Sequence, residues 1–183
     1  MTESAIYSIG HGNKKIEVFI KELKSFGISY LLDIRSKPFS KWYPWFNQNE
    51  LKTSLEENGI KYVYAGDSLG GLPDDRSCYN SDGKVVYDLL KKKDFFKDGI
   101  ARLTTANEKQ IKLAIMCSES NPEECHRTKL IGQELLKKKI SLKHIISEKL
   151  VKSQETVMME LTKGTGLVDL FGNEVDFKSR KSY

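Results

Sequence analysis

The sequence predicts an α/β domain of three layers, in which a mostly parallel sheet of about five strands carries helices on both faces. Short, mostly apolar segments of strand length alternate along the chain with segments whose apolar residues follow helical spacing. This alternation is typical of a parallel sheet that is covered on both faces. The chain has 183 residues, enough for one domain with its own core. We expect a single domain at residues 1–163 and a tail at residues 164–183 that is flexible or docked.

The first elements form a strand, a helix and a second strand. Residues 5–9 are a short apolar strand that ends just before His11. Residues 16–26 carry apolar side chains at helical spacing. Residues 28–34 form the second apolar strand, so the unit is a βαβ crossover, which should be right-handed.

The remaining elements follow the same alternation. In chain order they are a helix that contains Leu51 and Leu55, a strand at 60–65, a loop-like segment at 66–83, one or two helices at 85–107, a strand at 111–116, a helix from Asn121 to about Lys139, and a strand at 142–146. Pro122 follows a capping residue and precedes two acids, which is the pattern of a helix start.

Composition narrows the class of protein. Thirty Lys and Arg residues stand against twenty-five Asp and Glu, a formal net charge of +5 that favours anionic partners. We see no apolar run of the roughly 20 residues that a membrane span needs, and no secretory signal at the N-terminus. Three cysteines, an odd number, favour free thiols in a reducing compartment. The sequence therefore predicts a soluble, cytoplasmic protein without membrane contact.

Reactive side chains follow several of the expected strands. The first strand is followed by His11, the second delivers Asp33 and Arg35, and the fourth is followed by Cys117. Because ligands of open parallel sheets bind beyond the carboxyl ends of the strands, these groups should converge. Asp33 could hold Arg35 in a purely structural salt bridge or orient it toward an anion. The predicted anion-binding residues are Asp33, Arg35, Ser36, Gly70, Gly71 and Arg127.

The segment after the fourth strand contains the largest cluster of potentially reactive side chains. Cys117 lies between a strand and a helix N-terminus, where a thiol pKa can fall, so we expect it to act as a nucleophile or a polarised donor. His126 or His11 would be its base, and Glu119 a second acid–base group. Cys125 is expected to be a small buried residue of the helix. The predicted catalytic set is Cys117, His11, Glu119 and His126, which would suit a hydrolase or a transferase.

Two other chemistries are disfavoured by spacing. The loop of protein tyrosine phosphatases needs Arg six residues after the nucleophile, whereas Glu123 stands six residues after Cys117. A zinc site built from both cysteines would need Cys125 and His126, adjacent on a helix, to face one ion. We therefore predict no metal and no cofactor.

An aromatic loop at residues 38–46 offers a second hypothesis. Lys37 and Lys41 lie among its rings, a combination that can stack bases and hold phosphates. The chain could then be a non-catalytic nucleic-acid-binding module. The same loop could fold over the sheet as a lid or make a dimer contact, and these alternatives stay open.

The motifs together resemble the domain of unknown function 488 family. They are Tyr7-Ser8-Ile9-Gly10-His11, Leu32-Asp33-Ile34-Arg35-Ser36-x-Pro38-x-Ser40, Leu69-Gly70-Gly71, Cys117-x-Glu119-x5-Cys125-His126-Arg127 and His144-Ile145. The resemblance implies a small α/β domain and no particular activity. Gly12 departs from it, since the family usually has Ser or Thr there.

A shorter resemblance lies in the tail. Leu167-Val168-Asp169-Leu170-Phe171 is similar to peptides with which DNA-repair proteins bind the bacterial sliding clamp, although the usual leading Gln is missing. We prefer an amphipathic segment that docks on its own domain. The favoured function is an enzyme that acts on an anionic substrate, such as a nucleotide, nucleic acid or other phosphate-bearing molecule.

Overall fold

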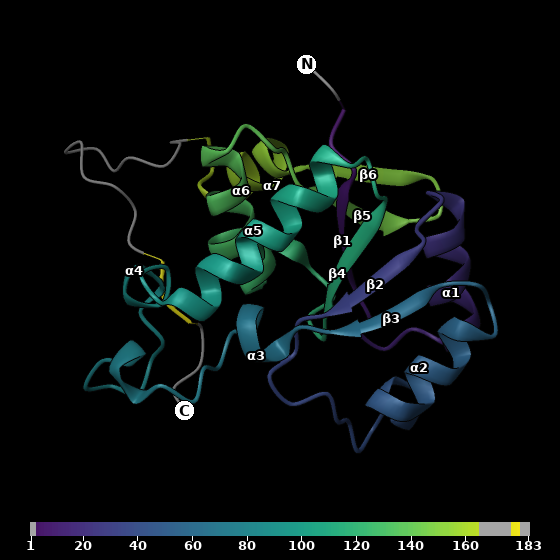
Figure 1. Ribbon diagram of the computed structural model, residues 1–183, viewed down its shortest axis with the longest axis horizontal. Helices are drawn as coiled ribbons and strands as arrows, with labels where there is room; N and C mark the ends of the chain where they lie inside the picture. The colour runs from purple at the N-terminus through teal and green to yellow at the C-terminus, as the bar shows by residue number, and fades with distance from the viewer. Residues whose placement is uncertain (1–2, 165–176, 180–183) are drawn as a thin grey trace.

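The computed structural model describes residues 3–164 and 177–179, in which a twisted sheet lies between two layers of helices (Figure 1). The expected α/β class is confirmed, but the expected number of about five strands is wrong, because six strands form the sheet of the described residues. The strands are β1 (Ile6–Gly10), β2 (Tyr30–Asp33), β3 (Lys61–Tyr64), β4 (Leu113–Cys117), β5 (Lys143–Ser147) and β6 (Leu150–Ser153).

The sheet has the order β3-β2-β4-β1-β5-β6 and is parallel except for its last strand. The extra strand, β6, pairs antiparallel with β5, and the register of this pairing shifts between Ile145 and Ser147 of β5. Only Val151 of this strand packs against the core. A short edge strand with so little apolar surface has no clear signature in the sequence.

Helices cover both faces of the sheet. They are α1 (Ile16–Ser25), α2 (Gln48–Glu56), α3 (Gly66–Leu69), α4 (Tyr87–Leu90), α5 (Asp94–Glu108), α6 (Gln133–Lys137) and α7 (Gln154–Leu161), with short turns η1 (Pro44–Phe46), η2 (Arg76–Cys78), η3 (Pro122–Glu124) and η4 (Arg127–Gly132). One core lies under α1 and α2 and contains Phe19 and Leu55. The other lies under α5, η4 and α6 and contains Leu103 and Leu130.

The order of the strands fixes where a ligand site can form. From the central strand β1 the chain moves through α1 to β2 and β3 on one side, and it later returns through β4 to β5 on the other. Connections that leave in opposite directions open a crevice at the carboxyl ends of the strands. In this sheet the crevice lies at the ends of β1, β4 and β2, where the register pairs Gly10 with Cys117.

The helix expected from Asn121 to Lys139 is broken, which corrects the prediction. Pro122 begins a short 3-10 turn, Cys125 is extended with φ −114° and ψ 154°, and a π-helical turn, η4, then leads into α6. The break turns the side chain of Arg127 into the sheet, where it reaches Ser8 of β1. A second difference is α3, which occupies the start of the segment expected to be a loop.

The described part of the C-terminal segment contacts the domain beside α4. Lys178 forms a bridge with Val86, and the hydroxyl of Ser179 accepts a hydrogen bond from the backbone N–H of Val85 at 2.9 Å. The motif at residues 167–171 lies outside the described residues. No helix in the described ranges combines the length and the apolar character needed to cross a membrane.

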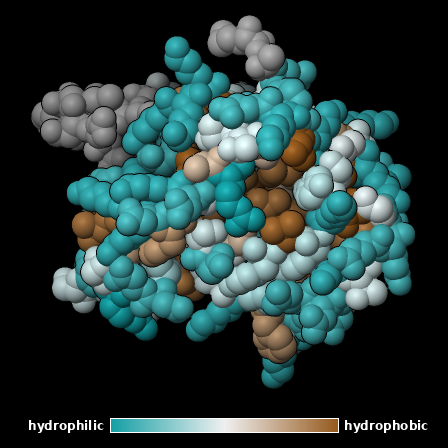
Figure 2. Space-filling model, in the orientation of Figure 1, coloured by the Kyte–Doolittle hydropathy of each residue, from teal (hydrophilic) through white to brown (hydrophobic). Residues whose placement is uncertain are grey.

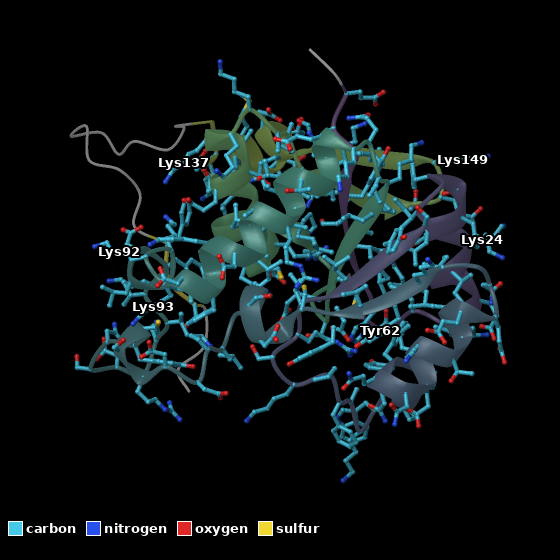
Figure 3. The ribbon with its side chains drawn as sticks, in the orientation of Figure 1. Lys24, Tyr62, Lys92, Lys93, Lys137 and Lys149 are labelled. Atoms are coloured by element: carbon cyan, nitrogen blue, oxygen red, sulfur yellow. The ribbon has the colours of Figure 1, made fainter. Side chains whose placement is uncertain are left out.

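The face of the molecule seen in Figure 2 is mostly polar. Figure 2 shows a face that is largely hydrophilic, with hydrophobic residues visible mainly over its centre. Of the lysines labelled in Figure 3, Lys92 and Lys93 lie together beside α4, whereas Lys24, Lys137 and Lys149 lie at other places around the periphery. Exposed large hydrophobic side chains include Phe39 and Trp42 in the aromatic loop, 73% and 79% exposed.

Candidate active site

Tight backbone packing joins the ends of β1 and β4. The backbone N–H of His11 donates to the carbonyl of Cys117 at 3.0 Å, and that of Gly12 donates to Ser118 at 3.1 Å. A Cβ on Gly10 would lie 2.0 Å from the carbonyl oxygen of Glu119, so only glycine permits this approach. The loop after β4 is therefore fixed against β1.

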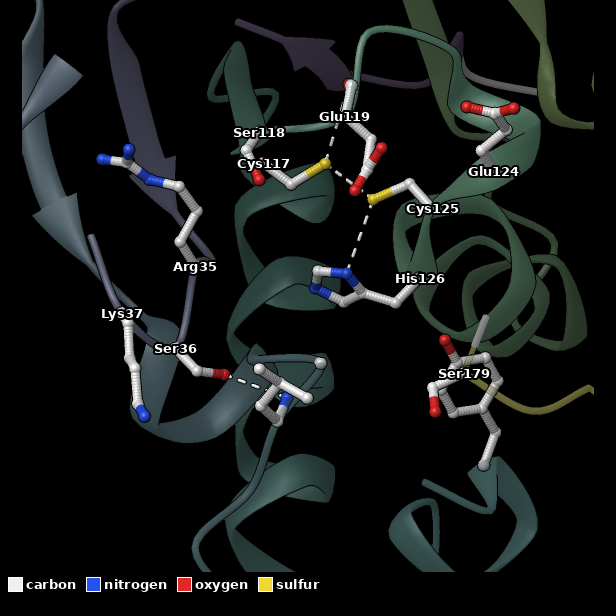
Figure 4. Close-up of a pocket in the computed structure, with 13 residues that line it drawn as sticks. Arg35, Ser36, Lys37, Cys117, Ser118, Glu119, Glu124, Cys125, His126 and Ser179 are labelled. Atoms are coloured by element: carbon white, nitrogen blue, oxygen red, sulfur yellow. Dashed lines mark hydrogen bonds between the residues drawn. The ribbon is translucent and has the colours of Figure 1, made fainter. Parts of the chain in front are cut away.

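Two cysteine sulfurs meet at this point. Cys117 is the last residue of β4, and Cys125 lies eight positions later, yet their Sγ atoms are 2.6 Å apart (Figure 4). Both residues are buried, and both line a cavity, with relative exposures of 2% and 3%. Sequence reasoning placed only Cys117 in the site, because Cys125 was expected to lie within a helix.

The extended backbone at Cys125 surrounds its sulfur with donors. The backbone N–H of Arg127 lies 3.5 Å from Sγ, and Nδ1 of His126 also lies 3.5 Å from it. Cys125 immediately precedes the helical turns, and a helix N-terminus stabilises a thiolate. The sequence pattern that predicted the long helix, Asn121-Pro122, begins a short 3-10 turn instead.

The two thiols differ in acidity. Burial, followed by the hydrogen bond to Cys125, raises the pKa of Cys117 well above its ordinary value. Burial also raises the pKa of Cys125, but the hydrogen bond from Cys117 and the charges of His126 and Arg127 outweigh it and bring that pKa well below the ordinary value. The backbone N–H of Arg127 and the imidazole of His126 lie beside Cys125, so Cys125 is the sulfur of the pair that is better placed to carry a negative charge.

Arg127 is the buried cation beside the thiolate. Its side chain is 1% exposed, donates from Nη2 to the Glu119 carbonyl at 2.7 Å and lies 3.4 Å from the Ser8 hydroxyl through Nη1. Across residues 3–164 and 177–179, no carboxylate pairs with it. A buried charge needs a counter-charge, and negative charge on the neighbouring sulfur pair raises the pKa of Arg127 more than burial lowers it.

A buried polar chain, absent from the sequence-based prediction, supports Arg127. The Ser8 hydroxyl bonds to Nδ1 of His144 at 2.7 Å, and Nε2 of His144 bonds to Oε1 of Gln154 at 2.8 Å. The amide nitrogen of Gln154 then donates to the carbonyl of Thr128 at 3.0 Å. Since Gln154 Oε1 can only accept, His144 carries its proton on Nε2 and accepts from Ser8. The sequence could have indicated this chain, because Ser8 and His144 are polar residues within apolar strand segments.

Asp33 and Arg35 form the second charged centre. Arg35 forms a bidentate pair with Asp33: its Nε donates to Oδ1 of Asp33 at 2.8 Å, and its Nη2 donates to Oδ2 at 2.6 Å. The Tyr62 hydroxyl also donates to Oδ2 of Asp33, at 2.8 Å. Nη2 of Arg35 additionally donates to the carbonyl of Phe46. Burial and the charge of Asp33 raise the pKa of Tyr62, so its hydroxyl remains a donor.

His11 lies beside this pair rather than beside the sulfurs. Its ring stacks on Phe46 with centroids 4.3 Å apart, and its Nδ1 bonds to the carbonyl of Gly12 at 2.9 Å. Its Nε2 is 3.5 Å from Nη1 of Arg35. Burial, aided by the charge of Arg35, lowers the pKa of His11 to about 4, so the ring is neutral near pH 7.

Two cavities adjoin at the charged centres. The first, about 180 Å³, is lined by Arg35, Ser36, Lys37, Gly71, Leu72, Tyr87, Cys117, Ser118, Glu119, Glu124, Cys125, His126 and Ser179. The second, about 490 Å³, is lined by His11, Gly12, Asn13, Arg35, Lys37, Phe39, Ser40, Tyr43, Ser118 and Ser120. They share Arg35, Lys37 and Ser118, so one molecule could occupy both.

The other candidate residues have mixed placements. Ser36, Gly71, Glu119 and His126 line the smaller cavity with the sulfurs (Figure 4). A Cβ on Gly71 would come within 3.1 Å of the His126 ring, so this glycine makes room for the imidazole. Gly70 lines neither cavity described above; a Cβ there would lie 2.1 Å from the carbonyl oxygen of Gly66 and 2.3 Å from the hydroxyl of Ser36.

In the described ranges, no group of three or more His, Cys, Asp and Glu residues could hold a metal ion. What the arrangement offers is a thiolate with a neighbouring thiol and imidazole, together with cationic groups at the cavity wall.

Comparison with known proteins identifies a family. Residues 15–133 match the model of the family described as Domain of unknown function DUF488. No curated protein and no solved structure matches the chain.

Proposed function

The chain belongs to the DUF488 family, whose description names no activity, and we propose from its site that it is a thiolate-dependent enzyme acting on an anionic substrate. The observation that carries the proposal is the meeting of Cys125, Cys117 and His126 in one cavity that Arg35 and Lys37 also line. Charge, nucleophile and proton donors at the carboxyl ends of parallel strands are the ingredients of group transfer.

Cys125 is the nucleophile in this proposal. Its thiolate attacks an electrophilic atom of the substrate and forms a bond to sulfur, while the bond to the leaving group breaks and the electron pair departs with that group. Cys117 or His126 supplies the proton that the leaving group takes up. Water or a second acceptor then displaces Cys125, which makes the enzyme a hydrolase or a transferase.

The substrate is anionic in this proposal because cations line both cavities. Lys37 and Arg35 stand where the two cavities adjoin. A smaller cavity of about 180 Å³ suits the reacting group, and the larger one of about 490 Å³ suits the rest of a nucleotide-sized molecule. Neutral His11 faces the larger cavity, where it can accept or donate a hydrogen bond to the substrate rather than activate the thiol.

Alkylation of the cysteines tests the proposal. Iodoacetamide near pH 7 should modify Cys125 faster than Cys78, because burial raises the pKa of Cys78. Trypsin separates Cys78, in the peptide at residues 77–84, from Cys117 and Cys125, which share the peptide at residues 113–127, and fragmentation of that peptide assigns the label to one of its two cysteines. Inorganic phosphate and nucleoside phosphates should slow the reaction of Cys125, and the variant Lys37→Ala should weaken that protection.

Two results would overturn the proposal. One is a Cys125 that alkylates no faster than Cys78 in the folded protein. The other is rapid alkylation whose rate is unchanged by phosphate, pyrophosphate and nucleoside phosphates. That result would refute the anionic substrate but not the reactive thiol. The variant Cys78→Ala, which lies outside both cavities, serves as the matched control.

The exposed aromatic loop favours a second function, a non-catalytic nucleic-acid-binding module. Phe39 and Trp42 are 73% and 79% exposed, and Nζ of Lys41 lies 5.9 Å from the Trp42 ring centroid. Single-stranded nucleic acid would stack on these rings. In this function Trp42→Ala reduces binding of a single-stranded oligonucleotide while Cys125→Ser does not, and binding falls steeply with salt. Binding that is indifferent to salt would exclude it.

A further inference from the structure

The sulfur pair has a property that nucleophilic catalysis does not require. The Sγ atoms of Cys117 and Cys125 are separated by 2.6 Å, whereas a disulfide bond is about 2.05 Å long. A single thiolate with a hydroxyl or imidazole donor would serve a nucleophile equally well. A second thiol at this distance provides a partner that can also form a covalent bond.

We propose that Cys117 and Cys125 are a peroxide-responsive dithiol that forms a reversible intramolecular disulfide, with Cys125 as the residue oxidised first and Cys117 as the resolving residue. The proposal rests on the same thiolate as the proposed function and adds a modification site to it. It predicts that oxidation removes the nucleophile and that reduction restores it.

The chemistry balances in two steps. The Cys125 thiolate attacks one oxygen of hydrogen peroxide, the O–O bond breaks, and a sulfenic acid forms while hydroxide leaves. Cys117 then loses its proton to that hydroxide and attacks the sulfenic sulfur, which forms the S–S bond and releases hydroxide that leaves as water after protonation. The sulfur pair loses two electrons overall, and peroxide accepts them. A dithiol reductant reverses the change by thiol–disulfide exchange.

The surroundings support this order of events. The smaller cavity of about 180 Å³ reaches both cysteines and is large enough for peroxide, which is little larger than water. The fully buried guanidinium of Arg127 and the backbone N–H at 3.5 Å favour negative charge on Cys125. Because the sulfurs already lie in contact, the bond can form with small side-chain movements.

A disulfide would leave Arg127 without its counter-charge. In the described structure, the guanidinium keeps two hydrogen bonds, to Ser8 and the Glu119 carbonyl, and its Nε has no partner there. Oxidation removes the thiolate while these bonds remain. A buried cation with no neutralising anion is costly, so the oxidised state should be less stable and easily reduced.

Peptide mass spectrometry tests the proposal on the natural protein. Both cysteines fall in one tryptic peptide, residues 113–127, so the disulfide lowers the mass of that peptide by two hydrogens. Stoichiometric hydrogen peroxide applied to the folded protein should produce this mass, and dithiothreitol should restore the original. The Cys78 peptide, residues 77–84, should keep a free thiol under the same treatment.

Single variants assign the two roles. In Cys117→Ser, Cys125 should accumulate as sulfenic acid that dimedone traps, and should proceed to sulfinic acid that dithiothreitol does not reverse. In Cys125→Ser, Cys117 should resist peroxide. Sulfenic acid that persists on Cys125 in the natural protein, or oxidation of Cys78 at the same rate, would overturn the proposal.

The outcomes separate this proposal from the proposed function. Rapid, phosphate-protected alkylation of Cys125 without disulfide formation would refute the dithiol alone. A disulfide that forms readily while phosphates give no protection would refute the anionic substrate alone. Failure of both reactions would refute the reactive thiolate on which the two proposals depend.

Discussion

Acidification should destabilise the protein through His144. The imidazole is fully buried; its Nδ1 accepts a hydrogen bond from the Ser8 hydroxyl, and its Nε2 donates one to Oε1 of Gln154. A proton added at Nδ1 would face the proton of Ser8 and lie near the charge of Arg127. Burial, together with that charge, therefore lowers the pKa of His144 from 6.5 to about 4.

The sign and size of the effect follow from these pKa values. Between pH 6.5 and 4 the unfolded chain binds a proton at this histidine that the folded protein does not, so the free energy of unfolding falls as the pH falls. The difference amounts to ~3 kcal/mol at pH 4. That is a large part of the roughly 5–15 kcal/mol that stabilises a typical domain. Above pH 6.5 the effect vanishes, because His144 is neutral in both states.

Urea unfolding at a series of pH values between 7 and 4 measures the effect. The variant His144→Gln should be less stable at pH 7, but its loss of stability on acidification should be ~3 kcal/mol smaller than that of the natural protein. Carboxylates titrate equally in both proteins, so the difference isolates the histidine. Parallel pH curves would refute the reasoning, and so would an NMR titration of His144 in the natural protein with a midpoint near 6.5.

Three further predictions concern packing and the second charged centre. Gly10→Ala should lower the unfolding free energy by more than ~2 kcal/mol, because its Cβ would meet the Glu119 carbonyl at 2.0 Å; a thermal midpoint equal to that of the natural protein would contradict this. Asp33→Asn should lower the free energy of unfolding, measured in urea, by ~3–5 kcal/mol, because it leaves Arg35 charged and poorly paired. Tyr62→Phe should lower it by only about 1 kcal/mol, because it removes a single hydrogen bond to Asp33. Equal losses in the two variants would contradict the description of Asp33 as the partner that neutralises Arg35. Leu55→Ala should cost ~2–5 kcal/mol through a core cavity while Val18→Ala, at a position 44% exposed, should change stability little. Similar calorimetric midpoints for the last two variants would argue against the described core.

The parallel part of the fold could be predicted because its physical signals are local. Continuous apolar segments such as β4 and amphipathic helices such as α1 identify themselves, and the alternation of the two implies parallel pairing. The edge strand β6 has no comparable signal, since Leu150 is exposed and the other residues are half-buried. Its place depends on pairing with β5, which is a tertiary property.

The meeting of Arg35 and Cys117 at one edge of the sheet could be predicted, but the contact between the two cysteines could not. The rule that ligands lie at the carboxyl ends of parallel strands brings Arg35 and Cys117 to one edge, and both line the smaller cavity. The contact of Cys125 depends on its own backbone, because an extended conformation there, instead of a continued helix, turns its sulfur toward Cys117. Sequence spacing alone does not report that break.

The two buried arginines have different functional consequences because they are neutralised differently. Asp33 neutralises the charge of Arg35 and accepts two hydrogen bonds from it. Arg35 therefore has little unbalanced charge to attract an anion, but it can offer the anion a hydrogen-bond donor held in a fixed position. Arg127 has no carboxylate partner within the described ranges, and the charge that it can neutralise is the thiolate of Cys125. In the proposed function, Lys37, which lines both cavities, is the cation that an anionic substrate would meet. Substitution of Lys37 should therefore affect anion binding, whereas substitution of Arg127 should affect the reactivity of the sulfur.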